Sequence, residues 1–206
     1  RHHHRDGLAG VGGLGQHGGR GKRGWRKLHL AVDPGRGEIL ACELTSNEKG
    51  DASQVGSLLE QIPGPIASVI ADGAYDGEPV YRVVAERQSD PPAAVIIPPR
   101  ATAVPSTAAG TAPSQRDRHV QLIRDKGRLH AASRHVPGDR YAMGWQKAVN
   151  YGRRSLGETA ISRYKALIGP SLRARTLPAQ KTEARAAYAV LNRMTRLGVP
   201  VSRRAA

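Results

Sequence analysis

The chain has 206 residues, which is long enough for one domain of ordinary size with a hydrophobic core. It carries 32 lysines and arginines against 17 aspartates and glutamates, and this net charge of +15 favours a polyanionic partner such as nucleic acid. A single cysteine excludes a disulfide framework and a cysteine-based four-ligand zinc site, and no apolar run approaches the roughly 18 residues of a membrane span.

Residues 1–24 are rich in glycine, arginine and histidine, with seven glycines between Gly7 and Gly19. This composition predicts a flexible N-terminal segment, because it offers little apolar surface to bury. A basic cluster follows beside Trp25 and is equally compatible with phosphate contact and with a solvated arm. Its members are Arg20, Lys22, Arg23, Arg26 and Lys27.

Two alternating stretches, residues 27–33 and 38–44, predict a β-hairpin closed by a turn over residues 34–37. Asp33 is interpreted as a residue of that turn, and Cys42 as a small hydrophobic core residue of the second strand. A helix is expected over residues 52–62, with Asp51 as its N-cap.

Residues 67–71 form a short apolar run without alternation, which is typical of a strand buried on both faces. The run stops at Asp72-Gly73, a dipeptide that is also a common turn. A helix is expected over residues 78–88 with Asp76 as its N-cap, and residues 95–97 predict another buried strand.

The segment from about residue 101 to 144 is interpreted as a loop or insertion, with a charged and helical stretch at 115–128. Two helices are then predicted, over residues 151–168 and 179–197, and residues 201–206 are interpreted as a tail. The order of elements predicts an α/β sheet with its functional site at the strand ends.

One set of residues, Tyr151, Arg154, Glu158 and Lys165, shares a stripe of the first of these helices. At about 100° per residue, the other three side chains come to within roughly 40° of Glu158. A tyrosine, two cations and one carboxylate on one stripe are compatible with a catalytic surface, although charged helix faces are more often simply solvated.

The spacing Tyr-x2-Arg-x3-Glu-x6-Lys resembles the signature around the catalytic glutamate of DDE-type insertion-sequence transposases of the family-four and family-five group. Residues 25–33, 71–76 and 191–195 resemble further motifs of that group in the same order. The resemblance covers about residues 17–130 and 144–202, and it identifies the chain as similar to a C-terminal portion of such a transposase.

The resemblance implies an α/β fold with a ribonuclease-H-like mixed sheet flanked by helices, here over residues 25–200. It further implies an Asp-Asp-Glu triad that holds two Mg²⁺ or Mn²⁺ ions for DNA strand cleavage and strand transfer, because hard divalent cations prefer oxygen ligands. Asp72 and Glu158 are the expected catalytic and metal-binding residues. The expected phosphate-binding residues are Tyr151, Arg154, Lys165, Arg26 and Lys27.

The partners implied are double-stranded DNA, as the element's terminal inverted repeats and as target DNA, and further copies of the chain in a homodimer or larger assembly. No membrane partner is expected, and the implied location is the bacterial cytoplasm, associated with the nucleoid during transposition. An unrelated structural or RNA-associated protein is a further alternative, but the chain lacks Phe and has few aromatic residues to stack bases.

The sequence departs from the family in two places. The first aspartate of the triad belongs to a strand that precedes residues 25–33, and the only upstream acid is Asp6, which follows no apolar run. Residues 131–143 also look foreign to the family. We therefore expect a sheet that lacks its first strand, and the alternative function is a degenerate, catalytically inactive remnant that only binds DNA.

Overall fold

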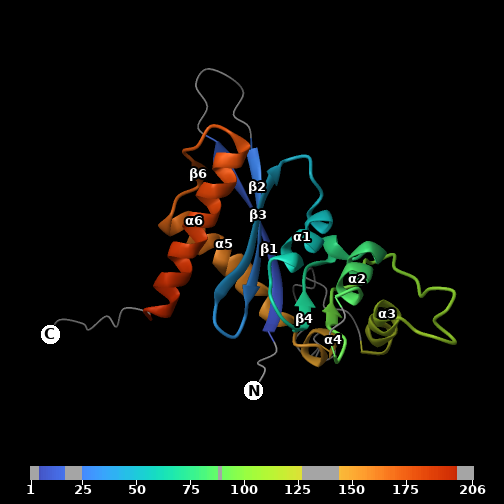
Figure 1. Ribbon diagram of the computed structural model, residues 1–206. Coiled ribbons are helices and arrows are strands. Elements are labelled where there is room, and N and C mark those ends of the chain that lie inside the picture. The colour runs from blue at the N-terminus through green and yellow to red at the C-terminus, as the bar shows by residue number, and fades with distance from the viewer. Residues whose placement is uncertain (1–4, 17–24, 88–89, 127–143, 199–206) are drawn as a thin grey trace, which may run out of the picture.

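The computed structural model describes residues 5–16, 25–87, 90–126 and 144–198 (Figure 1). Its centre is a six-stranded mixed sheet in the order β3-β2-β1-β4-β5, with the short β6 paired to β1. The strands are β1 (Arg5–Gln16), β2 (Trp25–Asp33), β3 (Glu38–Ser46), β4 (Ile66–Ile70), β5 (Ala94–Ile96) and β6 (Ser171–Leu172). The pairs β1/β2 and β2/β3 are antiparallel, whereas β4 runs parallel to both β1 and β5. The predicted α/β class and the predicted hairpin are confirmed.

Strand β1 shows that the expectation of a missing first strand is wrong. Five of its twelve residues are glycines, and glycine costs about 0.5–1 kcal/mol in a strand interior, so the local sequence gave no strand signal. The strand forms because it is paired along both edges, to β2 from Leu8↔Val32 to Gly15↔Trp25 and to β4 up to Leu8↔Ile70. Residues 5–16 therefore form part of the sheet, while residues 1–4 and 17–24 lie outside the described residues.

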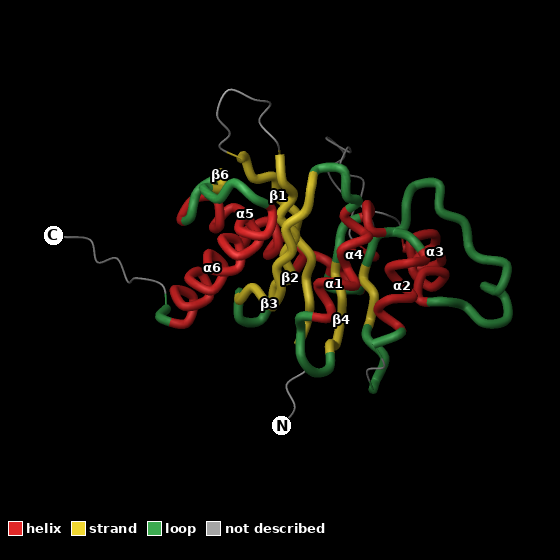
Figure 2. Tube along the Cα trace, turned by 45° about the horizontal axis from the view of Figure 1, so that its top comes forward, coloured by secondary structure: helices red, strands yellow, loops and turns green. Residues whose placement is uncertain are grey.

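Two helical layers cover the sheet, one on each face (Figures 1 and 2). Helices α5 (Ser155–Leu167) and α6 (Leu177–Arg196) pack on one face, where Leu28, Leu30 and Ile70 meet Ile161, Tyr164 and Leu191. Helices α1 (Val55–Glu60) and α2 (Glu78–Ala85) pack on the other face against Ala31, Val69 and Val95. The alternation of side chains along β2 and β4 thus supplies both cores.

Two of the predicted helices contain a 3₁₀ segment at their start. The helix expected at 52–62 is divided into η1 (Asp51–Gln54) and α1, and Gly50, not Asp51, is the N-cap residue of η1. The helix expected at 151–168 is divided into η3 (Tyr151–Arg154) and α5. The expected loop or insertion at 101–144 contains α3 (Gln115–Lys126) and ends where α4 (Gly144–Ala148) begins, and residues 127–143 lie outside the described part.

Two local interpretations are confirmed. Asp33 closes the hairpin turn, because its Oδ1 accepts hydrogen bonds from the N–H groups of Gly35 at 2.8 Å and Arg36 at 3.3 Å. Cys42 is buried in the core between the sheet and α6. Within the described ranges, no helix is both long and apolar enough to cross a membrane.

Candidate functional site

Asp72 lies two residues beyond the end of β4, at the carboxyl edge of the parallel strands. Its backbone is extended, and its Oδ1 accepts a hydrogen bond of 2.9 Å from the N–H of Ala74, so that it caps the 3₁₀ helix η2 (Gly73–Tyr75). The carboxylate therefore serves the turn with one oxygen. Its Oδ2 makes no hydrogen bond to the described residues and can take a ligand.

Glu158 lies in the first turn of α5, and its side chain is 63% exposed. Arg154 Nη2 lies 2.8 Å from Glu158 Oε1, and the Arg154 guanidinium carbon lies 5.8 Å from the centroid of the Tyr151 ring. Because η3 continues directly into α5, these three predicted site residues follow one another along one side of the segment. The structure brings them together as the spacing predicted.

Tyr151 connects this segment to Asp72. Burial raises the pKa of the Tyr151 hydroxyl, and the carboxylates of Asp72 and Glu158 raise it further, while Arg154 opposes them. Charges on both Asp72 and Glu158 therefore act on the same phenol. Tyr151 lies on η3, which contacts both β1 and β4 and continues into the helix that carries Glu158.

The other predicted phosphate-binding residues lie away from this tyrosine. Lys165 lies about two helical turns beyond Glu158, or roughly 10 Å along α5, and it forms no ion pair with the described residues. Arg26 Nε donates to Gln180 Oε1 at 3.0 Å on the α6 side of the sheet. Lys27 Nζ lies 3.1 Å from Asp51 Oδ1 on the opposite side. The structure thus gives Arg26 and Lys27 partners within the fold.

Asp72 and Glu158 each carry oxygen donors of the kind that a divalent metal prefers, but the described residues contain no group of three or more His, Cys, Asp or Glu able to hold one. The pairing register shows which residue of β1 lies nearest to the level of Asp72. The last pair between β1 and β4 is Leu8↔Ile70, and extending this register by two residues beyond β4 would place Gly10 opposite Asp72. Asp6 pairs with Ser68, which is four residues or roughly 13 Å before Asp72 along the sheet.

Gly10 also pairs with Leu30, whose side chain lies in the core under α5, so that position 10 belongs to the face that carries Glu158. The donors present therefore fit the preference of Mg²⁺ or Mn²⁺ for oxygen, while a three-carboxylate set is incomplete in the described residues.

Asp76 was expected to cap the next helix, and this expectation is wrong, because Gly77 is the N-cap residue of α2. The buried Asp76 carboxylate instead accepts hydrogen bonds from Arg116 Nε at 2.7 Å, Arg116 Nη2 at 3.1 Å and the N–H of Arg100 at 2.8 Å. Burial alone would raise the pKa of Asp76, but the bonds from Arg116 and Arg100 hold it below its ordinary value. This pair ties α3 to the segment that follows Asp72.

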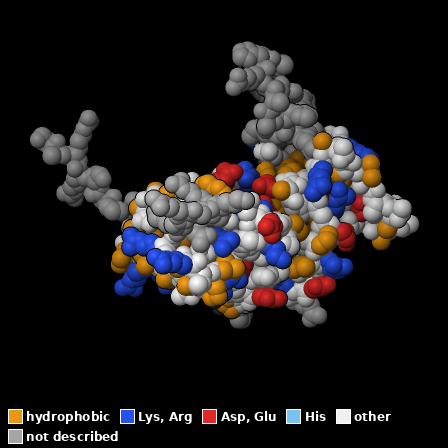
Figure 3. All heavy atoms as spheres, turned by 90° about the horizontal axis from the view of Figure 1, so that it is seen from above, with side chains coloured by type: hydrophobic (Ala, Val, Ile, Leu, Met, Phe, Trp, Pro, Cys, Tyr) orange, Lys and Arg blue, Asp and Glu red, His pale blue; other side chains and the backbone are white. Residues whose placement is uncertain are grey.

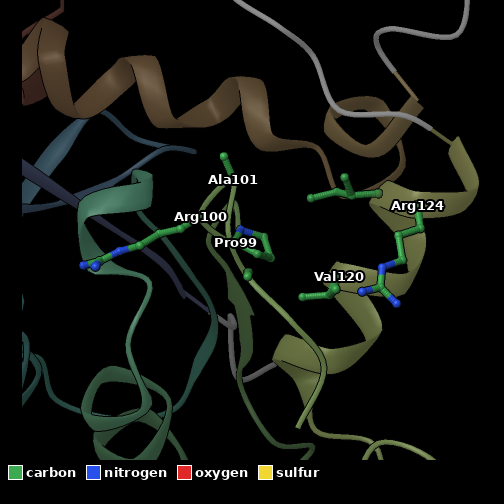
Figure 4. Close-up of a pocket in the computed structure, with 7 residues that line it drawn as sticks. Pro99, Arg100, Ala101, Val120 and Arg124 are labelled. Atoms are coloured by element: carbon green, nitrogen blue, oxygen red, sulfur yellow. The ribbon is translucent and has the colours of Figure 1, made fainter.

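A groove of about 350 Å³ opens between the segment after β5 and α3 (Figure 4). Its walls are mostly apolar, and Arg100 and Arg124 point in different directions instead of converging on one position. On the face seen from above, Lys and Arg side chains lie in separate groups with acids between them (Figure 3). Neither feature points to a ligand as directly as the carboxylates around Tyr151.

One comparison with known proteins bears on this site. A family model described as "Transposase DDE domain" matches residues 2–193, which is well over half of the chain. The match runs from the segment before β1 to within the last turn of α6 and includes Asp72, Tyr151 and Glu158.

Proposed function

The chain belongs to the transposase DDE domain family, and from this premise we propose that it is a DNA transposase that cleaves and joins DNA strands at insertion-sequence ends. The observation that carries the proposal is that η3, which leads into the helix of Glu158, packs against β1 and β4, the strand that leads to Asp72, and that the charges of both acids act on Tyr151. The strand order β3-β2-β1-β4-β5, with α5 over the central strands, supports a ribonuclease-H-like catalytic domain. That domain includes β1 as well as the residues from 25 to 200.

We propose that Asp72 and Glu158 are the catalytic carboxylates and the protein ligands of Mg²⁺ or Mn²⁺. When bound, such a metal pair would supply electrostatic stabilisation of the attacking and leaving oxygens of a phosphoryl displacement. Asp72 is held rigidly at the end of β4 by its bond to Ala74, whereas the exposed Glu158 side chain is free to adjust on α5. One fixed and one adjustable oxygen donor suit a site that must accept a substrate.

Arg154 and Tyr151 are proposed to bind phosphate oxygens beside the carboxylates. The guanidinium presents donors in a planar fork that matches a phosphate, and its position over the Tyr151 ring orients it. Lys165 would contact the DNA backbone further along α5. The side chains of Arg26 and Lys27 are engaged with Gln180 and Asp51 and are therefore not free for direct phosphate contact. We propose that they contribute to DNA binding only through their positive charge.

The partner proposed is double-stranded DNA, as terminal inverted repeats and as target, bound by a homodimer or a larger assembly. A net charge of +15 supports a polyanionic partner.

A second candidate function is that of a remnant which binds DNA without cutting it. The observation that favours it is the glycine at position 10, which would lie opposite Asp72 if the pairing of β1 with β4 is extended by two residues beyond Leu8↔Ile70. Without a third carboxylate, two-metal chemistry should fall by orders of magnitude. This candidate predicts DNA affinity that falls steeply with salt and no metal-dependent cleavage.

Nicking of supercoiled plasmid in Mn²⁺ or EDTA separates the two candidates, with Glu158→Ala as the test variant. Glu86→Ala is the matched control, because Arg82 and Glu86 form an exposed i,i+4 pair on α2 like Arg154 and Glu158 on α5. Metal-dependent nicking that Glu158→Ala abolishes and Glu86→Ala retains supports the enzyme. A folded parent that binds DNA but never nicks it supports the remnant, and a parent that neither nicks nor binds DNA contradicts both.

A further inference from the structure

Trp145 is an almost fully buried residue that belongs to neither of the two cores flanking the sheet. It lies on the short helix α4, and 2% of its surface is exposed. Among the described residues, Trp145 contacts His119 on one side and Tyr151 on the other. Its indole Nε1 donates a 3.0 Å hydrogen bond to His119 Nδ1, and its ring centroid lies 5.3 Å from that of Tyr151.

His119 lies on α3 and has both ring nitrogens engaged. Its Nε2 lies 2.8 Å from the carbonyl oxygen of Val95 on β5, and its Nδ1 accepts from Trp145. A carbonyl can only accept and an indole N–H can only donate, so His119 must be neutral with its proton on Nε2. The His119 and Trp145 rings meet edge to face, with centroids 5.5 Å apart and an interplanar angle of 80°. His119 therefore joins the sheet to Trp145 in one defined orientation.

The connection continues into the candidate site. Trp145 packs on Tyr151, the guanidinium of Arg154 lies over the Tyr151 ring, and Arg154 pairs with Glu158. Asp72 and β5 are fixed in the same sheet, because Ala71 N–H donates to the Ile96 carbonyl at 3.2 Å. A path of direct contacts thus runs from β5 through His119 and Trp145 to the start of α5.

We infer that His119 and Trp145 are positioning residues, which hold Tyr151 and the first turn of α5, the turn that carries Glu158, in a fixed orientation relative to the sheet. The contacts themselves do not depend on the proposed function. Only the reason why the orientation of Glu158 matters rests on that proposal. A buried indole N–H usually finds an acceptor, because an unsatisfied buried donor is costly. Here the acceptor, His119 Nδ1, belongs to the separate helix α3, which is bonded to β5 through His119 Nε2. We therefore expect the acceptor atom of His119, and not only the volume of its side chain, to affect the position of Trp145.

Hydrogen–deuterium exchange of the Tyr151–Glu158 amides tests the inference without depending on catalysis. His119→Phe keeps a ring but removes the acceptor, whereas His119→Asn places an amide oxygen near the position of Nδ1. We expect the Phe variant to exchange these amides about fivefold faster, since one buried hydrogen bond contributes about 1 kcal/mol, and the Asn variant to recover most of the protection. The α6 amides should stay at parental rates in both variants.

Trp145 emission supplies a second readout in a Trp25→Phe background, where Trp145 is the remaining tryptophan. The Phe variant should shift this emission and the Asn variant should restore it. If His119→Phe does not fold, Trp145→Phe removes the donor while keeping a ring beside Tyr151, and it should accelerate exchange over the same residues. Parental exchange at Tyr151–Glu158 in a folded His119→Phe protein, or no recovery in His119→Asn, overturns the inference. A parent that lacks nicking contradicts the proposed enzyme alone and leaves this result decisive.

Discussion

Arg154 and Glu158 form an ion pair of 2.8 Å across the junction between η3 and α5, with the Arg154 side chain 28% and the Glu158 side chain 63% exposed. An exposed i,i+4 pair contributes only about 0.3–0.5 kcal/mol to stability. The pair is therefore weak enough to open when a phosphate approaches the guanidinium. We expect this pair, which lies beside Tyr151, to matter more for binding than for folding.

The first prediction concerns DNA affinity. Arg154→Ala should weaken DNA binding about uniformly across sequences and reduce the slope of log K against log salt by about 1, because one phosphate contact is lost. Unfolding in urea should change by under about 0.5 kcal/mol. Arg82→Ala, which opens the comparable pair on α2, should leave the salt slope unchanged. Equal slopes in the parent and Arg154→Ala would remove Arg154 from the DNA interface.

The second prediction concerns the ligand position on β1. Gly10→Asp adds a carboxylate level with Asp72 on the face that carries Glu158, so we expect Mn²⁺ binding by calorimetry to strengthen at least about tenfold. Metal-dependent nicking should appear or increase in the same variant. Gly10→Asn has the same shape without the charge and is the matched control. Unchanged Mn²⁺ affinity in a folded Gly10→Asp protein would show that position 10 does not face the metal site.

The sequence predicts the fold best where patterning is strong. Residues 67–71 and 95–97 were identified as strands from their apolar runs, and they form β4 and β5 with shifts of one residue. Strand β1 was missed because its formation depends on pairing with β2 and β4 and not on local propensity. No sequence pattern reports such non-local pairing for a glycine-rich segment.

The candidate site also contains features that the sequence predicts and features that it does not. Family resemblance predicts Asp72 and Glu158 as candidate site residues, but it does not predict the contacts that surround them. The bonds from Arg116 to Asp76 and from Trp145 to His119 join residues far apart in the chain, with no periodic signal between them. Asn192 was noted only within a family motif, but its amide binds both the N–H and the carbonyl of Ile39 and so covers part of the β3 edge.

The third prediction concerns the buried pair between Asp76 and Arg116. Asp76→Ala leaves the arginine without its partner and frees the Arg100 N–H, so the free energy of unfolding should fall by about 3 kcal/mol. Chemical denaturation at neutral pH measures this. The exposed Glu86→Ala variant should lose under about 0.5 kcal/mol. A similarly small loss in Asp76→Ala would mean that α3 is not anchored through this pair.

The fourth prediction concerns stability in mild acid. His29 is fully buried, its Nε2 lies 2.9 Å from Thr45 Oγ1, and its Nδ1 has no hydrogen-bond partner among the residues that the structure describes. Burial lowers the pKa of His29, the nearby Lys27 acts in the same direction, and Asp51 and Glu43 oppose them. Burial also lowers the pKa of His119, so both imidazoles are neutral in the folded chain near pH 7.

Because both folded-state pKa values lie below the unfolded value of about 6.5, the unfolded chain binds more protons as the pH falls through that value. The histidine contribution to stability is therefore complete above about pH 7 and is lost as the pH falls below 6.5. Urea unfolding between pH 8 and pH 5 should show this decline. His29→Gln keeps a polar partner for Thr45 but does not titrate, so its decline should be shallower than that of the parent. Identical pH dependence in the two proteins would mean that His29 accepts a proton without cost in the folded state.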